Sequence, residues 1–356
     1  MYIPCLNGIR AYAIILVLLA HFLGSPNIPP IIRDLLGFAG FGTIGVRLFF
    51  LLSGFLITHV LVLEYEKNKF INIKSFFIRR ILRIFPCFYV YLIALFLLKS
   101  ASIIEIETNA LLFSLFYVQN LNVFQKSHAF TTSWLVKHSW SLSVEEQFYL
   151  FYPFFFARIK KLIKYNGILF LLISCLFCTF FRALNYSFPD ISRYVGGPFL
   201  MHIDFLLWGC VIRLLYKKYS KKIITHVSPF KNLLLILSLI LSAYASRIEY
   251  YNGINIMICG VLILLSNAYF LLYFLLFPNS TIGIMFENSY FGFIGKLSYS
   301  LYVWQQLFLG SSNLWLKYHF MTYAPINILC IFAFAVFSYY IVEKPFLRLK
   351  TRFSTV

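Results

Sequence analysis

A histidine and a carboxylate within apolar stretches are the side chains best suited to chemistry in this sequence. His21 lies in the apolar run 11–24, and Glu145 lies in WSLSVEEQF, residues 140–148, just before further apolar residues. Acidic side chains in a membrane segment are costly unless they are paired, protonated or facing a polar cavity. A histidine beside a carboxylate can act as a general base, because the carboxylate fixes the ring tautomer and stabilises the imidazolium.

We expect these two side chains to lie at the same depth in a membrane. Arg10 precedes His21 by eleven residues, which is roughly 16 Å along a helix axis. If Arg10 reaches the inner interface, His21 lies in the outer half of a hydrocarbon core of about 30 Å. Trp140 suits the outer interface, and Glu145 lies roughly 8 Å deeper. The sequence therefore predicts a contact between His21 and Glu145.

An arginine cluster precedes the third apolar stretch. The segment FFIRRILRIFP, residues 76–86, contains Arg79, Arg80 and Arg83. Arg80 and Arg83 are three residues apart and share one helix face. Guanidinium groups bind phosphate through two parallel hydrogen bonds, so this face suits a phosphorylated cofactor. Anchoring to lipid headgroups explains the cluster equally well.

The composition indicates an integral membrane protein. Hydrophobic residues make up 61% of the chain, aromatic residues 20% and charged residues only 12%, which excludes a water-soluble domain. The net charge of +19 would suggest nucleic acid in a soluble protein. Here the basic residues fall in short runs between apolar stretches, as in membrane loops. We therefore expect a lipid bilayer and no nucleic acid as the partner.

We predict an all-α, polytopic membrane helix bundle of about ten transmembrane helices. A crossing needs about 20 apolar residues, and the candidate stretches centre on residues 9–24, 40–63, 84–100, 141–158, 167–183, 198–215, 232–247, 253–275, 290–312 and 323–342. Polar residues interrupt the segment near 109–124, which suits a re-entrant or interfacial position. Ten crossings with both termini cytoplasmic place most lysines and arginines inside. Residues 1–356 then form a single domain with no appended soluble domain.

Further polar residues have simpler interpretations. Gly54, which follows Ser53 in an apolar stretch, allows two helix backbones to approach closely. A nucleophilic Ser53 would need an adjacent base that the sequence does not place. The histidines show no spacing that suits a metal ion, so we expect no metal.

The sequence resembles the acyltransferase-3 family of membrane O-acyltransferases over nearly its whole length. The resemblance rests on blocks in family order, namely LNGIRAYAIILVLLAHF, GVRLFFLLSGFLIT, RRILRIFP, WSLSVEEQFYLFYP, HIDFLLWG, GKLSYSLYVW and VEKPF. It implies a bacterial inner-membrane enzyme that takes an acetyl group from cytoplasmic acetyl-CoA. The implied acceptor is a hydroxyl of a cell-envelope polysaccharide such as lipopolysaccharide O-antigen.

The resemblance also implies residue roles. His21 corresponds to the catalytic histidine and Glu145 to its partner carboxylate, while Arg10, Arg80 and Arg83 serve cofactor engagement or acyl transfer. The chain departs from the family pattern at three positions. Arg47 stands where many members carry an acidic residue, His202 where an arginine is common, and Gln305 where a histidine is frequent. We assign no role to those three.

A proton-coupled transporter or flippase is the alternative. It would use His21 and Glu145 as a proton relay inside the membrane. Transporters commonly contain internal repeats with broken helices in corresponding positions, and this sequence shows no such repeat. The sequence therefore favours the enzyme.

Overall fold

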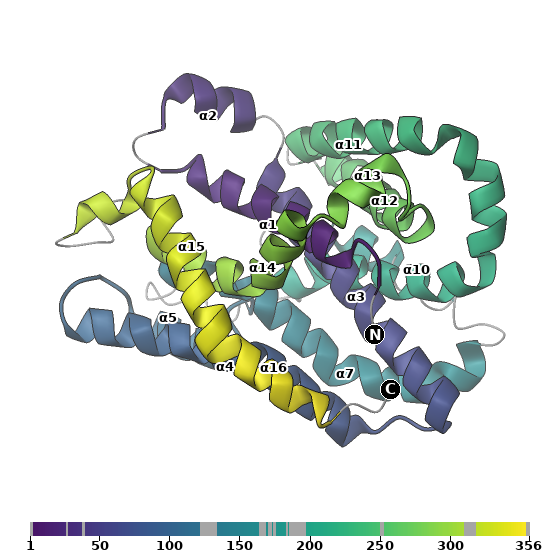
Figure 1. The fold of residues 1–356 in the computed structure, drawn as a ribbon, viewed down its shortest axis with the longest axis horizontal. Helices are drawn as coiled ribbons and strands as arrows, with labels where there is room; N and C mark the ends of the chain where they lie inside the picture. Colours follow the sequence, from purple (N-terminus) through teal and green to yellow (C-terminus); the bar gives the residue numbers. More distant parts are fainter. Residues whose placement is uncertain are drawn as a thin grey trace.

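The protein is built from helices (Figure 1). The computed structural model describes residues 3–25, 28–37, 40–121, 134–163, 169, 173, 176–182, 184, 197–249, 253–309 and 318–353. Within these ranges the elements are α1 (Leu6–Phe22), α2 (Pro30–Gly37), α3 (Phe41–Asn68), α4 (Ile73–Ser100), α5 (Thr108–Leu115), α6 (Trp134–Lys137), α7 (Ser139–Ile163), α10 (Gly197–Val227), η3 (Ser228–Phe230), α11 (Lys231–Ile248), α12 (Gly253–Leu276), α13 (Thr281–Phe286), α14 (Ser289–Phe308), η6 (His319–Thr322), α15 (Ile326–Ser338), η7 (Tyr339–Glu343) and α16 (Lys344–Thr351). No strand is among them, which confirms the all-α prediction.

Five helical stretches of the described chain are long and apolar enough to cross a membrane. They are Phe41–Asn68, Ile73–Ser100, Lys218–Ile248, Asn255–Leu276 and Ile326–Thr351. They support a multi-pass membrane protein, whereas the count of about ten crossings stays a prediction. The expected crossings in α1, α7 and α14 are helical as well, but α1 is short and the other two carry polar side chains that line internal cavities. Of the expected crossing at 167–183, the structure describes residues 169, 173 and 176–182.

The segment near 109–124 begins with α5, a helix of eight residues. Eight residues span about 12 Å as a helix, which is too short to cross a bilayer. After α5 the chain turns and is tied to α7, since the amides of Asn120 and Gln147 exchange hydrogen bonds of 2.9 and 2.8 Å. The described part of the segment therefore does not cross a bilayer as a helix, and its re-entrant or interfacial position stays a prediction. Residues 122–124 lie outside the described chain.

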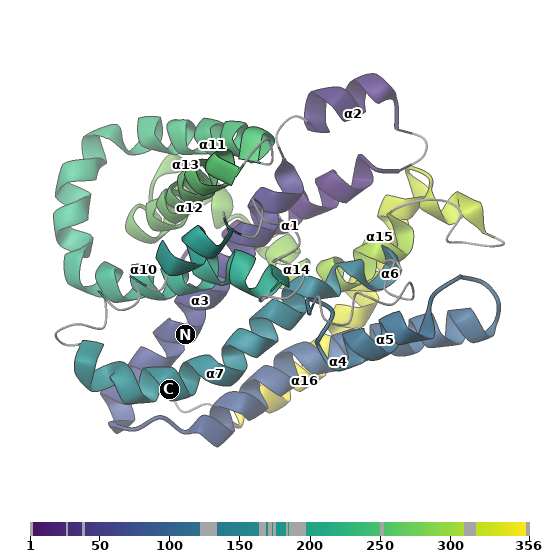
Figure 2. The same cartoon turned by 180° about the vertical axis from the view of Figure 1, so that it is seen from behind.

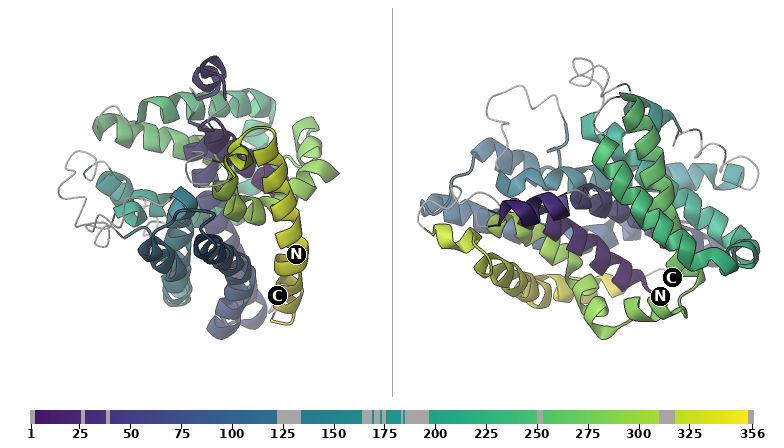
Figure 3. Two further views of the ribbon diagram at one scale, coloured as in Figure 1. Left: turned by 90° about the vertical axis from the view of Figure 1, so that its left-hand side faces the viewer. Right: turned by 90° about the horizontal axis from the view of Figure 1, so that it is seen from above.

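The helices α1, α3 and α14 lie at the centre of the molecule (Figures 1 and 2). The helices α10 to α13 pack on one side of them, and α4, α5, α7, α15 and α16 lie on the other. The two ends of the described chain lie close together in the further views (Figure 3). A hydrogen bond of 2.8 Å from Arg79 to the carbonyl of Phe353 holds the C-terminal end against α4. The central helices are therefore placed to carry a shared site.

Glycines allow α3 to pack closely on its neighbours. A Cβ atom at Gly54 would lie 1.8 Å from the carbonyl oxygen of Leu206 in α10, and one at Gly209 would lie 2.1 Å from that of Leu51. Real Cβ atoms essentially never come so close, so only glycine fits at these two crossing points. The prediction that Gly54 serves close helix packing is confirmed.

Candidate active site

The predicted arginines line one cavity between α1, α3, α4, α7 and α14. We call it the arginine cavity, and it encloses about 800 Å³ of space including its mouth. Its charged side chains are Arg10, Arg80, Arg83 and Glu145. Apolar and aromatic side chains such as Phe49 and Leu56 form much of the remaining wall. An apolar wall with a few convergent polar groups is typical of a small-molecule site.

The three arginines of this cavity have no carboxylate partner among the described residues, since every ion pair recorded there involves Arg47, Arg79 or Arg182. The guanidinium of Arg80 lies over the ring of Tyr149, 4.6 Å from its centroid, and this contact leaves its edge available. The neighbouring Arg79 differs, because it pairs with Glu64 at 3.0 Å. The sequence prediction therefore selected the face of α4 that meets the cavity.

Glu145 is held inside the arginine cavity by hydroxyl groups. The Ser53 hydroxyl donates a hydrogen bond of 2.9 Å to one carboxylate oxygen, and the Tyr149 hydroxyl donates one of 3.3 Å to the other. Ser53 thus acts as a donor to Glu145. This geometry orients the carboxylate toward the arginines that share its cavity.

His21 lines a second cavity, which we call the histidine cavity. It encloses about 870 Å³ including its mouth. Its polar walls come from α1, α3, α6, α7, α10 and α14, and from the residue between α6 and α7, and they contain His21, Arg47, Trp134, Lys137, His138, Trp140, His202 and Gln306. The cavity thus combines aromatic rings and ring nitrogens with the positive side chains of Arg47 and Lys137.

A glutamine fixes the orientation of the His21 ring. Nδ1 of His21 lies 3.0 Å from Oε1 of Gln305. An amide oxygen only accepts hydrogen bonds, so Nδ1 carries the proton and Nε2 is left as the basic nitrogen. The ring of Trp134 meets the imidazole edge to face at 5.5 Å. Gln305, to which we assigned no role from the sequence alone, is therefore the partner of His21.

The next glutamine of α14 holds a second histidine in the same way. Oε1 of Gln306 accepts from the backbone N–H of His138 at 3.0 Å and lies 2.7 Å from its Nδ1. Because the backbone group must donate, the side-chain atom is the oxygen and Nδ1 of His138 is protonated. Sequence reasoning missed this pair. The signal was the dipeptide Gln305–Gln306 in the last two turns of α14, directly after the hydrophobic residues 301–304.

The predicted contact between His21 and Glu145 is wrong. Among the described residues the imidazole bonds to Gln305 and the carboxylate to Ser53 and Tyr149, and the two lie in different cavities. The prediction placed Glu145 at the level of His21. In the structure Glu145 lines the same cavity as Arg10, and His21 lies roughly 16 Å further along α1.

The two cavities meet at a common wall. Val46 and Tyr302 line both of them. Four stretches of chain pass from one cavity to the other: α1, α3, α14 and the region from α6 to α7. The described chain thus places the arginines on one side of a thin wall and His21 on the other.

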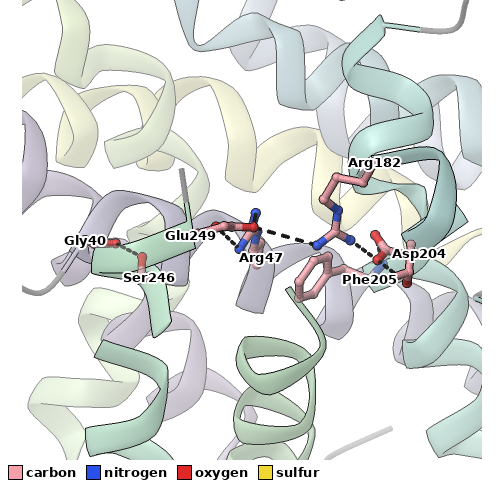
Figure 4. A network of polar contacts seen from close by, with 8 residues as sticks. Gly40, Arg47, Arg182, Asp204, Phe205, Ser246 and Glu249 are labelled. Atoms are coloured by element: carbon pink, nitrogen blue, oxygen red, sulfur yellow. Dashed lines mark hydrogen bonds and ion pairs between the residues drawn. The ribbon is translucent and has the colours of Figure 1, made fainter. Parts of the chain in front are cut away.

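Arg47 reaches the histidine cavity from a buried charge network (Figure 4). Its guanidinium donates two hydrogen bonds, of 2.7 and 2.6 Å, to the carboxylate of Glu249, which follows α11. Arg182 lies 3.9 Å from the same carboxylate and pairs with Asp204 of α10. The ring of Phe205 lies between the two guanidiniums, 5.0 and 5.2 Å from them.

This network explains a basic residue at position 47. Two arginines and two carboxylates are all almost fully buried, and their formal charges cancel. Buried charges persist when they are paired and hydrogen-bonded. Arg47 is therefore a structural group at the edge of the histidine cavity. The network also accounts for Asp204, whose partner was undefined in the sequence.

A family comparison agrees with this geometry. The acyltransferase-3 family model, described as an acyltransferase domain, matches residues 3–343. The chain belongs to the acyltransferase-3 family. Six of the seven blocks that carry the sequence resemblance lie within this match, and VEKPF, residues 342–346, begins inside it. The members of the predicted site all lie within the match.

Several bacterial proteins are similar to this acyltransferase-3 chain across 97% of its length. A Staphylococcus aureus (strain COL) protein named as a candidate O-acetyltransferase is 30% identical over 375 residues. The peptidoglycan O-acetyltransferase OatA of Listeria monocytogenes is 27% identical, and the O-acetyltransferase OatA of Staphylococcus aureus (strain NCTC 8325) is 26% identical. The alignments cover 56–57% of these relatives, so the chain spans a little over half their length. No solved structure matches significantly.

Proposed function

We propose that this chain is a membrane O-acetyltransferase. It takes an acetyl group from cytoplasmic acetyl-CoA at the arginine cavity and transfers it to a sugar hydroxyl at the histidine cavity. The supporting observation is the pair of cavities with Arg10, Arg80 and Arg83 on one side of a shared wall and His21 on the other. Membership in the acyltransferase-3 family supports the reaction type.

The arginine cavity suits the phosphorylated donor. Its three guanidiniums lack carboxylate partners among the described residues, so their charge is available to phosphate oxygens. Arginine binds phosphate bidentately and keeps its charge in a buried setting. The apolar wall of the cavity would contact the uncharged arm of coenzyme A that carries the thioester.

His21 supplies the base in this proposal. With its Nδ1–H directed at Gln305, its Nε2 accepts the proton of the acceptor hydroxyl. The hydroxyl oxygen forms a bond to the thioester carbonyl carbon, the carbon–sulfur bond breaks, and His21 returns the proton to the departing thiolate. The products are the acetyl ester and coenzyme A, and no metal or oxidant is needed.

The acceptor we propose is a polysaccharide of the cell envelope. A bacterial inner-membrane position with both termini cytoplasmic would place the histidine cavity toward that polysaccharide. Lipopolysaccharide O-antigen is the acceptor that the sequence resemblance suggests, and the name of one relative gives peptidoglycan for that relative. Mass spectrometry of both glycans from cells with and without the gene distinguishes the two acceptors.

The transporter alternative loses its geometric support. A relay between His21 and Glu145 requires a contact, and the described residues place them in separate cavities with other partners. Glu145 then has a different role in our proposal. It balances the positive charge of the arginine cavity when the donor has left.

The test uses membranes that contain the protein, radiolabelled acetyl-CoA and envelope glycan. We expect His21→Ala to lower label transfer by about 10²- to 10⁴-fold, the usual contribution of a general base. The matched control is His226→Ala, since His226 is an exposed histidine of α10 outside both cavities. Both variants are quantified in the membrane fraction. Full transfer by His21→Ala would refute the role of His21, and no transfer by the unaltered protein would refute the proposed reaction.

A further inference from the structure

Two side chains of the wall between the cavities face both sides. Val46 of α3 and Tyr302 of α14 line the arginine cavity and the histidine cavity alike. We propose that Val46 and Tyr302 limit the length of the acyl group that the protein transfers. This inference rests on the proposed function, because a donor bound by the arginines must bring its acyl group past these side chains to reach His21.

Tyr302 is held rigidly from the α7 side. Its hydroxyl donates a hydrogen bond of 3.0 Å to the carbonyl of His138 and lies 2.6 Å from the hydroxyl of Ser141. Its ring meets the His138 ring edge to face at 5.4 Å and the Phe49 ring at 6.4 Å. The side chain is only 8% exposed. A ring fixed at its tip and on its sides cannot swing away to admit a larger group.

Val46 is equally constrained, because α3 presses against α1 beside it. A Cβ atom at the adjacent Gly45 would lie 2.6 Å from the carbonyl oxygen of Ala13. A Cβ atom one turn earlier, at Gly42, would lie 3.0 Å from the Cβ of Ala20. The backbone of α3 is therefore already in contact with α1 and has no room to retreat. Valine is also β-branched and has few rotamers in a helix.

A gap between two fixed side chains discriminates by size. One methylene group in an apolar pocket changes the specificity of an enzyme by roughly 10- to 200-fold. The wall lies between the arginine cavity, where the donor binds, and His21. It therefore contacts the carbon chain that extends from the thioester carbonyl of the donor. The substrate class that fits is a short acyl thioester, with acetyl preferred over propionyl and butyryl.

The experiment compares donors of increasing length. Membranes with the protein receive equal concentrations of acetyl-, propionyl- and butyryl-CoA with the same glycan, and the ratio of longer-acyl to acetyl transfer is measured. We expect Val46→Ala to raise the butyryl-to-acetyl ratio by about tenfold or more, and Val46→Ile to lower the propionyl-to-acetyl ratio by a similar factor. Val62→Ala removes the same atoms from a half-buried valine of α3 outside both cavities and should leave the ratios unchanged.

Tyr302→Phe tests the other side of the wall. It keeps the ring and removes both hydroxyl contacts, so the ring gains freedom and the ratio of longer-acyl to acetyl transfer should rise. Suppose that the unaltered protein transfers acetyl, and that both Val46 variants and Tyr302→Phe show the same ratios of longer-acyl to acetyl transfer as the unaltered protein. The proposal that Val46 and Tyr302 limit acyl length is then wrong, and the proposed function stands. If the unaltered protein transfers no acyl group from any donor, the proposed function fails and the inference fails with it.

Discussion

Two adjacent glutamines of α14 set the ring orientation of two histidines. Gln305 accepts from His21, and Gln306 accepts from His138. Successive residues of a helix point about 100° apart, so one dipeptide can serve two neighbouring histidines of the same cavity. A neutral amide orients an imidazole and fixes its tautomer without adding a negative charge.

The first residue-scale prediction concerns Gln305. Gln305→Leu removes the acceptor of the Nδ1 proton, so His21 can rotate and populate the wrong tautomer. We expect the kcat for acetyl transfer to fall by about 10- to 100-fold, a part of the full contribution of a general base. The measurement is the rate of label transfer at saturating acetyl-CoA.

A double variant separates orientation from general damage. In the His21→Ala background, Gln305→Leu should cause little further loss, because the residue acts through the imidazole. Equal proportional losses in both backgrounds would mean that Gln305 acts independently of His21.

At the scale of the elements, α3 contributes both to the cavities and to helix packing. It contributes Val46 to the wall, Ser53 to the support of Glu145, and Gly54 to the contact with α10. These residues lie within about two turns of one another and face different neighbours. The packing of α3 therefore sets the position of both cavities at once.

A glycine substitution tests this packing. Gly54→Val would force α3 and α10 apart, because even a Cβ atom would meet the Leu206 carbonyl at 1.8 Å. We expect a lower melting temperature in detergent and little protein in the membrane fraction. The matched control is Gly292→Ala in α14, where a Cβ would meet nothing within 4 Å. Alanine there should stabilise the helix by up to about 1 kcal/mol. An unchanged melting temperature for Gly54→Val would contradict the close packing.

At the scale of the whole molecule, the buried charge network joins segments far apart in sequence. Arg47, Arg182, Asp204 and Glu249 belong to α3, the segment 176–182, α10 and the end of α11 (Figure 4). Glu249→Gln leaves Arg47 buried beside a weaker acceptor. Breaking a buried ion pair from one side costs about 3–5 kcal/mol, so we expect a marked fall in melting temperature.

The control for this prediction replaces both members of the pair. Arg47→Met combined with Glu249→Met leaves no unpaired charge and should cost less than Glu249→Gln alone, as measured by thermal unfolding in detergent. A double variant less stable than the single one would indicate that the charges themselves are needed.

The sequence predicted the helical membrane architecture from apolar stretches of sufficient length, and it placed Arg80 and Arg83 on one helix face from their spacing. Their grouping with Arg10 came from the family resemblance. The sequence did not predict the separation of His21 from Glu145. Counting residues from Arg10 gives a position along α1 only. Tertiary packing is what places Glu145 in the cavity of Arg10 and His21 in the other cavity. The partnership of Arg47 with Glu249 also joins residues 202 positions apart, beyond any local pattern.

The shared wall has a consequence for the energy supply of the cell. If donor and acceptor approach from opposite faces of the membrane, Val46 and Tyr302 separate two aqueous compartments at different voltage. Each elementary charge that leaks across loses about 2.3 kcal/mol per 100 mV. A proton is far smaller than an acetyl group, so these fixed side chains must leave no water-filled path beside a passing acyl chain. An enzyme with a wider opening would discharge the proton-motive force as it worked.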